Sequence, residues 1–288
     1  MYSDLINILN KYHTMQIIIF SLIPAILYLF LMYVTTPYNT WSFNRAMYYL
    51  GIGTIAIPIV LAIHHFFPWW NELYKHPSDD LAKLLVLAFI QIALLEESIK
   101  FLAFKLFYGL RQKFRKTELH PLAIMVYCGA TALGFAFVEN IAYANRAIDM
   151  ASSMNILYWR AISAVILHMV CGLMIGYWIS LSRFDFQIKS NPINSVRGIS
   201  IFDLFIRRKW FRKIFYTIVG ISMATFIHGI YDYNLLGLEF FNGSFSDVNI
   251  AFTIQMLILA LSLYITKRMA NHLVILTNKQ RKKIGNKN

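Results

Sequence analysis

Seven long runs of apolar residues, each about the length of a membrane-spanning helix, dominate this 288-residue sequence. A bilayer core about 30 Å thick requires roughly 20 apolar residues in a helix. The runs are continuous rather than alternating, which excludes strands, and a helix satisfies its own backbone hydrogen bonds in lipid. We therefore predict an all-α, polytopic transmembrane helical bundle that forms one integral membrane domain over residues 1–288. The predicted spans lie near residues 15–34, 46–67, 81–105, 121–147, 157–182, 213–236 and 248–267.

The composition supports a lipid environment. Hydrophobic residues make up 58% of the chain and charged residues 14%, against roughly 45–50% and about 25% in soluble domains. A net charge of +13 would suit nucleic-acid binding, but Lys and Arg lie in the segments between apolar runs rather than on one amphipathic face. We therefore expect contact with anionic membrane lipids and no nucleic acid. Cys128 and Cys171 fall inside apolar runs and are expected to be packing residues.

The basic residues also predict the orientation. They follow the third and fifth spans and fill the C-terminal segment, whereas the connection after the sixth span carries only Glu239 and Asp247. Lys and Arg collect on the cytoplasmic side of a membrane. We therefore predict that the N-terminus is outside and the C-terminus cytoplasmic, with a cytoplasmic loop at 183–212 and a basic cytoplasmic tail at 268–288.

We single out seven ionisable residues inside the predicted spans. A charge at the bilayer centre costs about 2.5–3.5 kcal/mol on insertion scales. Such groups should therefore face inward and meet one another, within one cavity about 10 Å across, which is roughly the reach of side chains between packed helices. They are Glu96, Glu97 and Lys100 in the third span, Glu139 in the fourth, His168 in the fifth, and His228 and Asp232 in the sixth.

The spacing of these residues predicts specific pairs. Glu96 and Lys100 are four positions apart and stack on one helical face as an ion pair, and Glu97 and Lys100, three apart, are nearly as close. His228 and Asp232 have the same spacing, so the carboxylate can hold the imidazole in one tautomer. The adjacent carboxylates of Glu96 and Glu97 repel, which suits one of them to act as a general base or acid.

Two further features concern packing around the site. His168, Gly172 and Gly176 form one helical stripe, which lets a neighbouring helix approach closely beside the imidazole. Asn140 is expected to cap or bridge helices.

Peptide hydrolysis in a membrane needs a water molecule, a base and a group that stabilises the oxyanion. Glu96 or Glu97 would be the base, with His168 or His228 facing the developing charge. Alternatively, His168, His228 and Glu139 would hold zinc or another divalent metal with an open position for water. Charge counting is compatible with both mechanisms, and we favour the metal because that ligand set is complete. In either case Lys100, Asn140 and Asp232 are supporting residues.

At these positions the sequence resembles the PrsW family of bacterial intramembrane proteases, within the superfamily of the type II CAAX prenyl endopeptidases. The resemblance covers residues 81–236, the predicted catalytic core, and the sequence contains no His-Glu-x-x-His motif. Four motifs carry it: Glu96-Glu97-Ser98-Ile99-Lys100, Phe135 to Glu139-Asn140, His168 with Gly172 and Gly176, and His228-Gly229-Ile230-Tyr231-Asp232.

The resemblance implies an intramembrane endopeptidase in the bacterial inner (plasma) membrane. Its substrate would be a single-pass or lipid-anchored membrane protein, such as an anti-sigma factor, cut near the outer face. A proton-coupled transporter is the alternative, because buried carboxylates and histidines also form proton relays. A transporter favours helices broken by Gly or Pro and symmetric halves, and neither is evident in the sequence. A non-catalytic scaffold that binds a partner helix would leave the adjacent glutamates unexplained.

Overall fold

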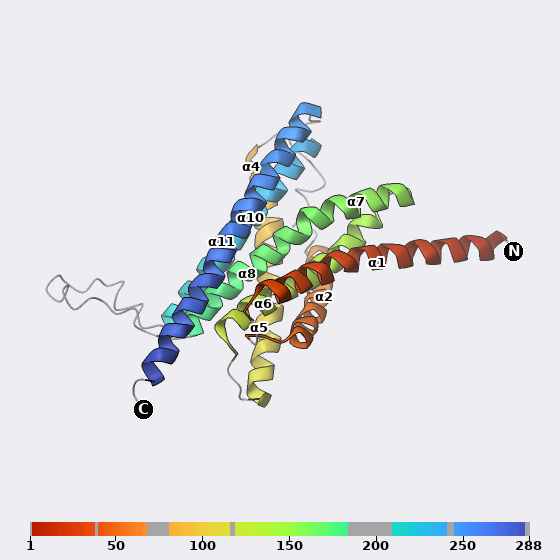
Figure 1. Cartoon of the computed structure of the whole chain (residues 1–288). Coiled ribbons are helices and arrows are strands. Elements are labelled where there is room, and N and C mark those ends of the chain that lie inside the picture. The colour runs from red at the N-terminus through yellow and green to blue at the C-terminus, as the bar shows by residue number, and fades with distance from the viewer. Residues whose placement is uncertain are drawn as a thin grey trace.

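A computed structural model describes residues 2–37, 40–67, 81–115, 119–183, 209–240 and 245–285. Every regular element in these ranges is a helix, and the helices pack into an elongated bundle (Figure 1), which confirms the all-α prediction. The longest elements are α1 (Tyr2–Thr35), α2 (Phe43–Phe66), α5 (Leu95–Arg115), α6 (Pro121–Ala144), α8 (Ala164–Arg183), α10 (Lys209–Phe240) and α11 (Phe245–Gly285).

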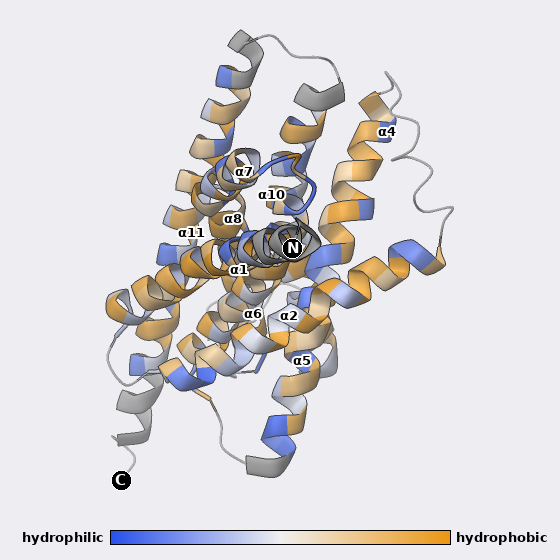
Figure 2. Ribbon diagram, turned by 90° about the vertical axis from the view of Figure 1, so that its right-hand side faces the viewer, coloured by the Kyte–Doolittle hydropathy of each residue, from blue (hydrophilic) through white to orange (hydrophobic). Residues whose placement is uncertain are grey.

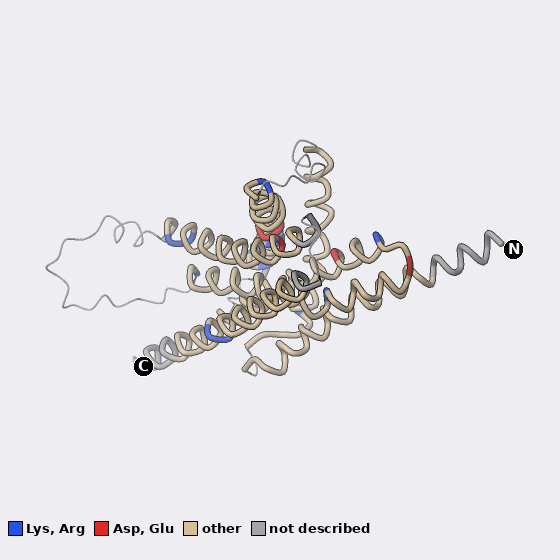
Figure 3. Tube along the Cα trace, turned by 90° about the horizontal axis from the view of Figure 1, so that it is seen from above, with Lys and Arg blue, Asp and Glu red and all other residues tan. Residues whose placement is uncertain are grey.

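Six helical segments of the described chain are long and apolar enough to cross a membrane. Hydrophobic residues cover most of their length (Figure 2), and charged residues are sparse along them (Figure 3). The six segments coincide with six of the seven predicted spans. They are Tyr12–Thr35, Phe43–Phe66, Pro121–Ala144, Met150–Arg183, Trp210–Gly237 and Asn249–Asn278.

The remaining predicted span, 81–105, is helical throughout but divided. A short helix α4 (Leu81–Val86) leads into a π-helix η2 (Leu87–Leu94), and α5 then begins at Leu95. Glu96 and Glu97 lie in the first turn of α5, and Lys100 follows one turn later, whereas η2 before them is apolar except for Gln91. π-Helical turns are rare and concentrate at functional sites, and this one immediately precedes Glu96 and Glu97.

The fifth span is also interrupted. It consists of α7 (Met150–Ile162) and α8, separated at Ser163, whose backbone is non-helical with φ −126° and ψ −79°. The hydroxyl of Tyr231 donates to Oγ of Ser163 at 2.9 Å, which ties the break to α10. The sequence predicts an unbroken helix here because neither this interruption nor the π-helix falls at Gly or Pro.

Helix α7 begins at Met150, seven residues before the predicted start of the fifth span, and Asp149 caps it. The carboxylate of Asp149 accepts a hydrogen bond from the backbone N–H of Ser152 at 2.7 Å. That hydrogen bond lowers the pKa of the Asp149 carboxyl below its ordinary value. An aspartate at this position satisfies a free N–H of the first turn and so starts the helix.

Helix α6 lies at the centre of the bundle and packs most extensively against α8 and α2. A Cβ atom added at Gly172 would lie 2.6 Å from the carbonyl oxygen of Cys128, and one at Gly176 would lie 2.6 Å from Cα of Met125. The glycine stripe below His168 therefore allows close approach of a neighbouring helix, as predicted, and that helix is α6. Both cysteines are buried free thiols in this core, also as predicted.

Helix α11 extends beyond the predicted span end at residue 267 and through most of the predicted tail, to Gly285. Its later turns remain helical because they still have a packed side: Leu273 is fully buried, and Met269 and Val274 pack against the core. The predicted loop 183–212 lies, except at its two ends, outside the described residues. Its cytoplasmic location and the orientation of the termini remain predictions.

Candidate active site

Four helices bring the predicted site residues together inside the bundle. The side chains are buried: Glu97 is 0% exposed, His168 1%, and His228 3%. Each helix contributes its own part of the set: Glu96, Glu97 and Lys100 from α5, Glu139 and Asn140 from α6, His168 from α8, and His228 and Asp232 from α10. The predicted convergence of carboxylates and imidazoles is therefore confirmed.

Lys100 lies at the centre of the group. Its Nζ is 2.6 Å from Oε1 of Glu97 and 3.6 Å from Oε2 of Glu96, so both glutamates pair with it. The same ammonium lies 2.9 Å from Nδ1 of His168 and 4.2 Å from the ring centroid of Phe135. The closer ion pair is thus made by Glu97, at i,i+3, rather than by Glu96 at i,i+4.

These contacts define the tautomer of His168. A protonated lysine has three donors and no acceptor, so Nδ1 of His168 accepts from Lys100 and the ring proton resides on Nε2. Nε2 lies 2.8 Å from Oε2 of Glu139, which accepts that proton's hydrogen bond. His168 is therefore a neutral imidazole between a cation and a carboxylate.

His228 lies between two carboxylates. Its Nδ1 is 2.8 Å from Oε1 of Glu97, and its Nε2 is 3.2 Å from Oδ2 of Asp232. The pairing of His228 with Asp232 is the one that the i,i+4 spacing predicted. Nε2 is also 3.9 Å from Oε2 of Glu96. The rings of His168 and His228 meet edge to face, with centroids 5.0 Å apart.

Arg160 of α7 belongs to the site although sequence analysis did not select it. Its Nη2 donates to Oε2 of Glu139 at 2.5 Å and its Nε to Oδ1 of Asn140 at 2.7 Å, so Asn140 bridges two helices. The guanidinium lies 3.9 Å from the ring centroid of Tyr143. Arg160 falls within the predicted span 157–182. It is an ionisable residue inside an apolar run, which is the criterion that selected the other buried charges.

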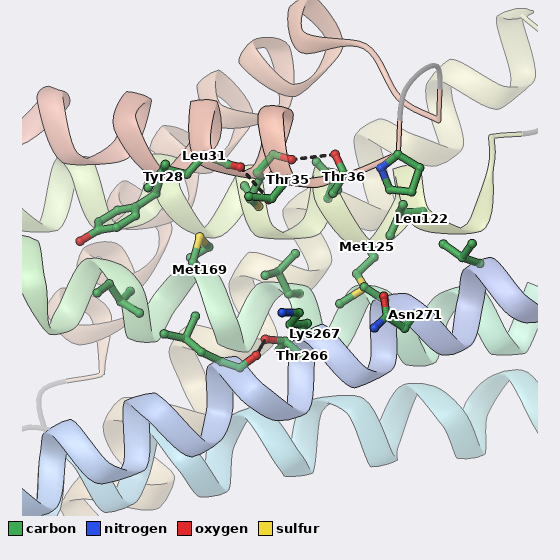
Figure 4. A pocket seen from close by; sticks show the side chains of 18 residues that line it. Tyr28, Leu31, Thr35, Thr36, Leu122, Met125, Met169, Thr266, Lys267 and Asn271 are labelled. Atoms are coloured by element: carbon green, nitrogen blue, oxygen red, sulfur yellow. Dashed lines mark hydrogen bonds between the residues drawn. The ribbon is translucent and has the colours of Figure 1, made fainter.

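A cavity of about 250 Å³ adjoins this cluster, bounded by α6, α7, α8, α10 and η2. It is large enough for several water molecules. Its lining includes five polar site residues: Glu139, Arg160, His168, His228 and Asp232. A larger cavity of about 700 Å³ lies between α1 and α11 (Figure 4), and no carboxylate or imidazole of the described residues lines it. The smaller cavity is therefore the one beside the predicted site residues.

The donor atoms fit a divalent metal. One ligand atom each from Glu96, His168 and His228 lies within 4.8 Å of the others. Among the described residues, Oε2 of Glu96 is buried without a hydrogen-bond partner. Two imidazoles and one carboxylate form a common ligand set for catalytic zinc. Sequence analysis had proposed Glu139 as the carboxylate, whereas the structure places Glu96 in this group and pairs Glu139 with Arg160 and His168.

The charge of the cluster also fits. Four carboxylates (Glu96, Glu97, Glu139 and Asp232) surround two permanent cations, so the net charge is −2 with both imidazoles neutral. One divalent cation neutralises it. Two protons would do the same, for example one on His228 and one on a buried carboxylate, although not one on Nδ1 of His168 while that atom accepts from Lys100. If His168 bound a metal through Nε2, that atom would lose its proton. If it bound through Nδ1, that atom would lose its contact with Lys100.

A membrane-spanning helical bundle with carboxylates, imidazoles and a cavity for water at its core has the parts that an intramembrane hydrolase needs. A family model described as "PrsW family intramembrane metalloprotease" matches residues 40–262. This chain belongs to the PrsW family, and it is an intramembrane protease.

Two curated relatives have the name "Protease PrsW". The protein from Oceanobacillus iheyensis is 25% identical over 192 residues, which are 67% of this chain and 71% of the relative. The protein from Geobacillus kaustophilus is 24% identical over 152 residues, 53% of each chain. No solved structure matches this chain.

Proposed function

We propose that this protein hydrolyses a peptide bond of a membrane-protein substrate at the site formed by Glu96, Glu97, Glu139, His168 and His228. The observation that carries the proposal is the pair of imidazoles at the cavity wall, each oriented by a carboxylate. Oriented imidazoles beside a buried carboxylate and a water-sized space are the parts that peptide hydrolysis requires.

The buried carboxylates divide into two roles in this proposal. Glu97 is fully buried and holds both Lys100 and Nδ1 of His228, so it positions these groups. Oε2 of Glu96 makes no hydrogen bond among the described residues and lies near Nε2 of His228, which makes Glu96 our candidate for the base. His228, supported by Asp232, then faces the developing oxyanion.

A metal would use the same residues. Glu96, His168 and His228 would hold a divalent ion such as zinc, which supplies a more acidic water and polarises the scissile carbonyl. Glu97 and Asp232 would then orient His228, and Glu139 and Lys100 would orient His168, as ligand-supporting groups do in metal sites.

The cavity lies towards the end of the bundle where α6 and α10 finish, which is the predicted extracytoplasmic end. We therefore propose that the substrate, a single-pass or lipid-anchored protein of the bacterial inner membrane, is cut near the outer face. An anti-sigma factor is the substrate class that the family resemblance implies.

The test is cleavage by purified protein in detergent, with a panel of single-pass proteins from the same cell as substrates. Glu96→Gln, Glu97→Gln and His228→Ala should each lower the cleavage rate by about 10²–10⁴-fold, the usual contribution of acid–base groups. Each variant should unfold cooperatively on heating, which shows that it is folded.

Asp149→Asn and His272→Ala are matched controls. Asp149 is an exposed helix cap, and His272 contacts Tyr177, outside the site. Both variants should cleave at the rate of the unmodified protein. Full activity of the Glu96 and His228 variants would show that the site is misassigned. Proton-dependent solute movement without cleavage would favour the transporter.

A further inference from the structure

A second polar cavity lies at the opposite end of the helices that carry the active site. Its volume is about 270 Å³, and it lies between the middle of α5, the end of α8 and the beginning of α10. Three cationic residues line it, one from each helix: Lys105, Arg183 and Lys213. Among the described residues, no carboxylate lines this cavity.

Arg183 is held in place by neutral groups. Its Nη1 donates to Oε1 of Gln112 at 3.0 Å, and its guanidinium lies 4.2 Å from the ring centroid of Tyr108. Gln112 in turn donates to the hydroxyl of Tyr108 at 2.7 Å. These contacts orient the guanidinium without cancelling its charge. An oriented guanidinium is well suited to a phosphate, because its donors can bind two oxygens at once.

The remaining wall of the cavity is apolar. Phe101 and Phe104 of α5 are buried, and Ile179 and Ile218 lie on the facing helices. A free inorganic anion would not bury this apolar surface, whereas a ligand with an acyl chain would cover it. The combination of three cations with an apolar wall therefore favours an anionic amphiphile.

The depth of the cavity in the membrane agrees with this chemistry. Arg183 is the last residue of one membrane-spanning segment, and Lys213 lies in the first turn of another, which begins at Trp210. The cations therefore lie near the edge of the bilayer, on the side that the Lys and Arg distribution predicts to be cytoplasmic. Basic pockets between helices at this depth bind anionic lipid headgroups.

We propose that this cavity binds an anionic phospholipid, with the phosphate at Lys105, Arg183 and Lys213 and an acyl chain along the apolar wall. The bound lipid would connect α5, α8 and α10, which carry Glu96, His168 and His228 at their other halves. It would therefore stabilise the arrangement of the helices that form the active site.

The experiment uses the full chain purified in detergent and titrated separately with phosphatidylglycerol, phosphatidylcholine and inorganic phosphate. The thermal unfolding midpoint and the retention of lipid in native mass spectrometry are measured. Phosphatidylglycerol should raise the midpoint and stay bound. Phosphatidylcholine and inorganic phosphate at the same concentration should do neither.

Substitution of the three cations identifies the site. The triple variant Lys105→Gln, Arg183→Gln, Lys213→Gln should bind phosphatidylglycerol about a hundredfold more weakly, and each single variant about fivefold more weakly, from the usual attraction per basic residue. The matched control Lys113→Gln, Lys267→Gln, Arg268→Gln removes three cations that do not line the cavity, and should bind as the unmodified protein does.

Three results would overturn the proposal: equal binding by the triple variant and the unmodified protein, equal effects of the two lipids, or a full effect of inorganic phosphate alone. If the triple variant does not fold, the single variants at Lys105 and Lys213 decide, because both side chains are exposed and substitutions at exposed positions usually change stability little.

Discussion

Nη2 of Arg160 lies 2.5 Å from Oε2 of Glu139, and Nε2 of His168 lies 2.8 Å from the same oxygen. One carboxylate oxygen thus joins α6, α7 and α8. The side chains of Arg160 and Glu139 are both 13% exposed, so the pair is largely removed from water. Removing one member of such a pair leaves a buried charge without its partner.

Arg160→Gln should therefore destabilise the protein by about 3–5 kcal/mol. The double variant Arg160→Gln, Glu139→Gln should recover much of that loss, because neither charge remains. Thermal and denaturant unfolding in detergent measure both effects as a double-mutant cycle. Arg146→Gln is the control, since Arg146 is exposed and contacts only the edge of the site through Tyr143. If the two arginine variants are equally stable, the buried pair contributes nothing.

Lys100→Ala should lower stability by several kcal/mol, because it leaves Glu96 and Glu97 buried without their cation. Lys113→Ala, further along α5 and exposed, should stay within about 0.5 kcal/mol of the unmodified protein. Expression level and unfolding midpoint measure the difference. A stable Lys100→Ala protein would mean that the two carboxylates are protonated in the fold.

The metal content of variants shows whether Glu96 or Glu139 is the carboxylate ligand. We expect about one divalent ion per chain in protein purified without chelator, measured by elemental analysis. Substitution of a ligand should lower the metal content about tenfold or more, and this applies to Glu96→Gln, His168→Ala and His228→Ala. Glu139→Gln alters a group that supports His168 and should lower metal affinity by about 10–100-fold. That variant should still retain metal when the metal is supplied in excess. The reverse pattern for Glu96 and Glu139 would restore the ligand set proposed from the sequence.

The close contact of α6 and α8 predicts which glycines tolerate a methyl group. Gly176→Ala would place Cβ 2.6 Å from Cα of Met125 and should cost about 1–3 kcal/mol in stability. Gly109→Ala meets no atom within 4 Å and should be neutral or stabilising by up to about 1 kcal/mol, since alanine favours helix. Unfolding midpoints of the two variants test this. Equal midpoints would contradict the close packing beside His168.

The predicted orientation is tested by cysteine labelling in intact cells with a membrane-impermeant reagent. Ser244→Cys, after the sixth span, should react from outside, and Ser190→Cys should react only after lysis, because basic loops stay in the cytoplasm. The two native cysteines are buried and provide a low background. Labelling of Ser190→Cys in intact cells would reverse the assignment.

The sequence by itself determined the class of fold and most of the site. Apolar runs about 20 residues long admit only helices in lipid, and ionisable residues within them, such as Glu97 and His228, have to face one another because lipid contact is too costly. The i,i+4 pairing of His228 with Asp232 and the glycine stripe below His168 are local, so spacing alone was enough to predict them.

The tertiary structure decided what depends on contacts between helices. Spacing within α5 does not show that Glu97, rather than Glu96, takes the shortest bond from Lys100 and also holds His228 of α10. Nor does it show that Glu139 pairs with Arg160 from α7 while Glu96 joins the two imidazoles. The sequence also leaves unmarked the break at Ser163, which Tyr231 of α10 contacts, and the π-helix, which packs against α10, because no Gly or Pro stands at either place.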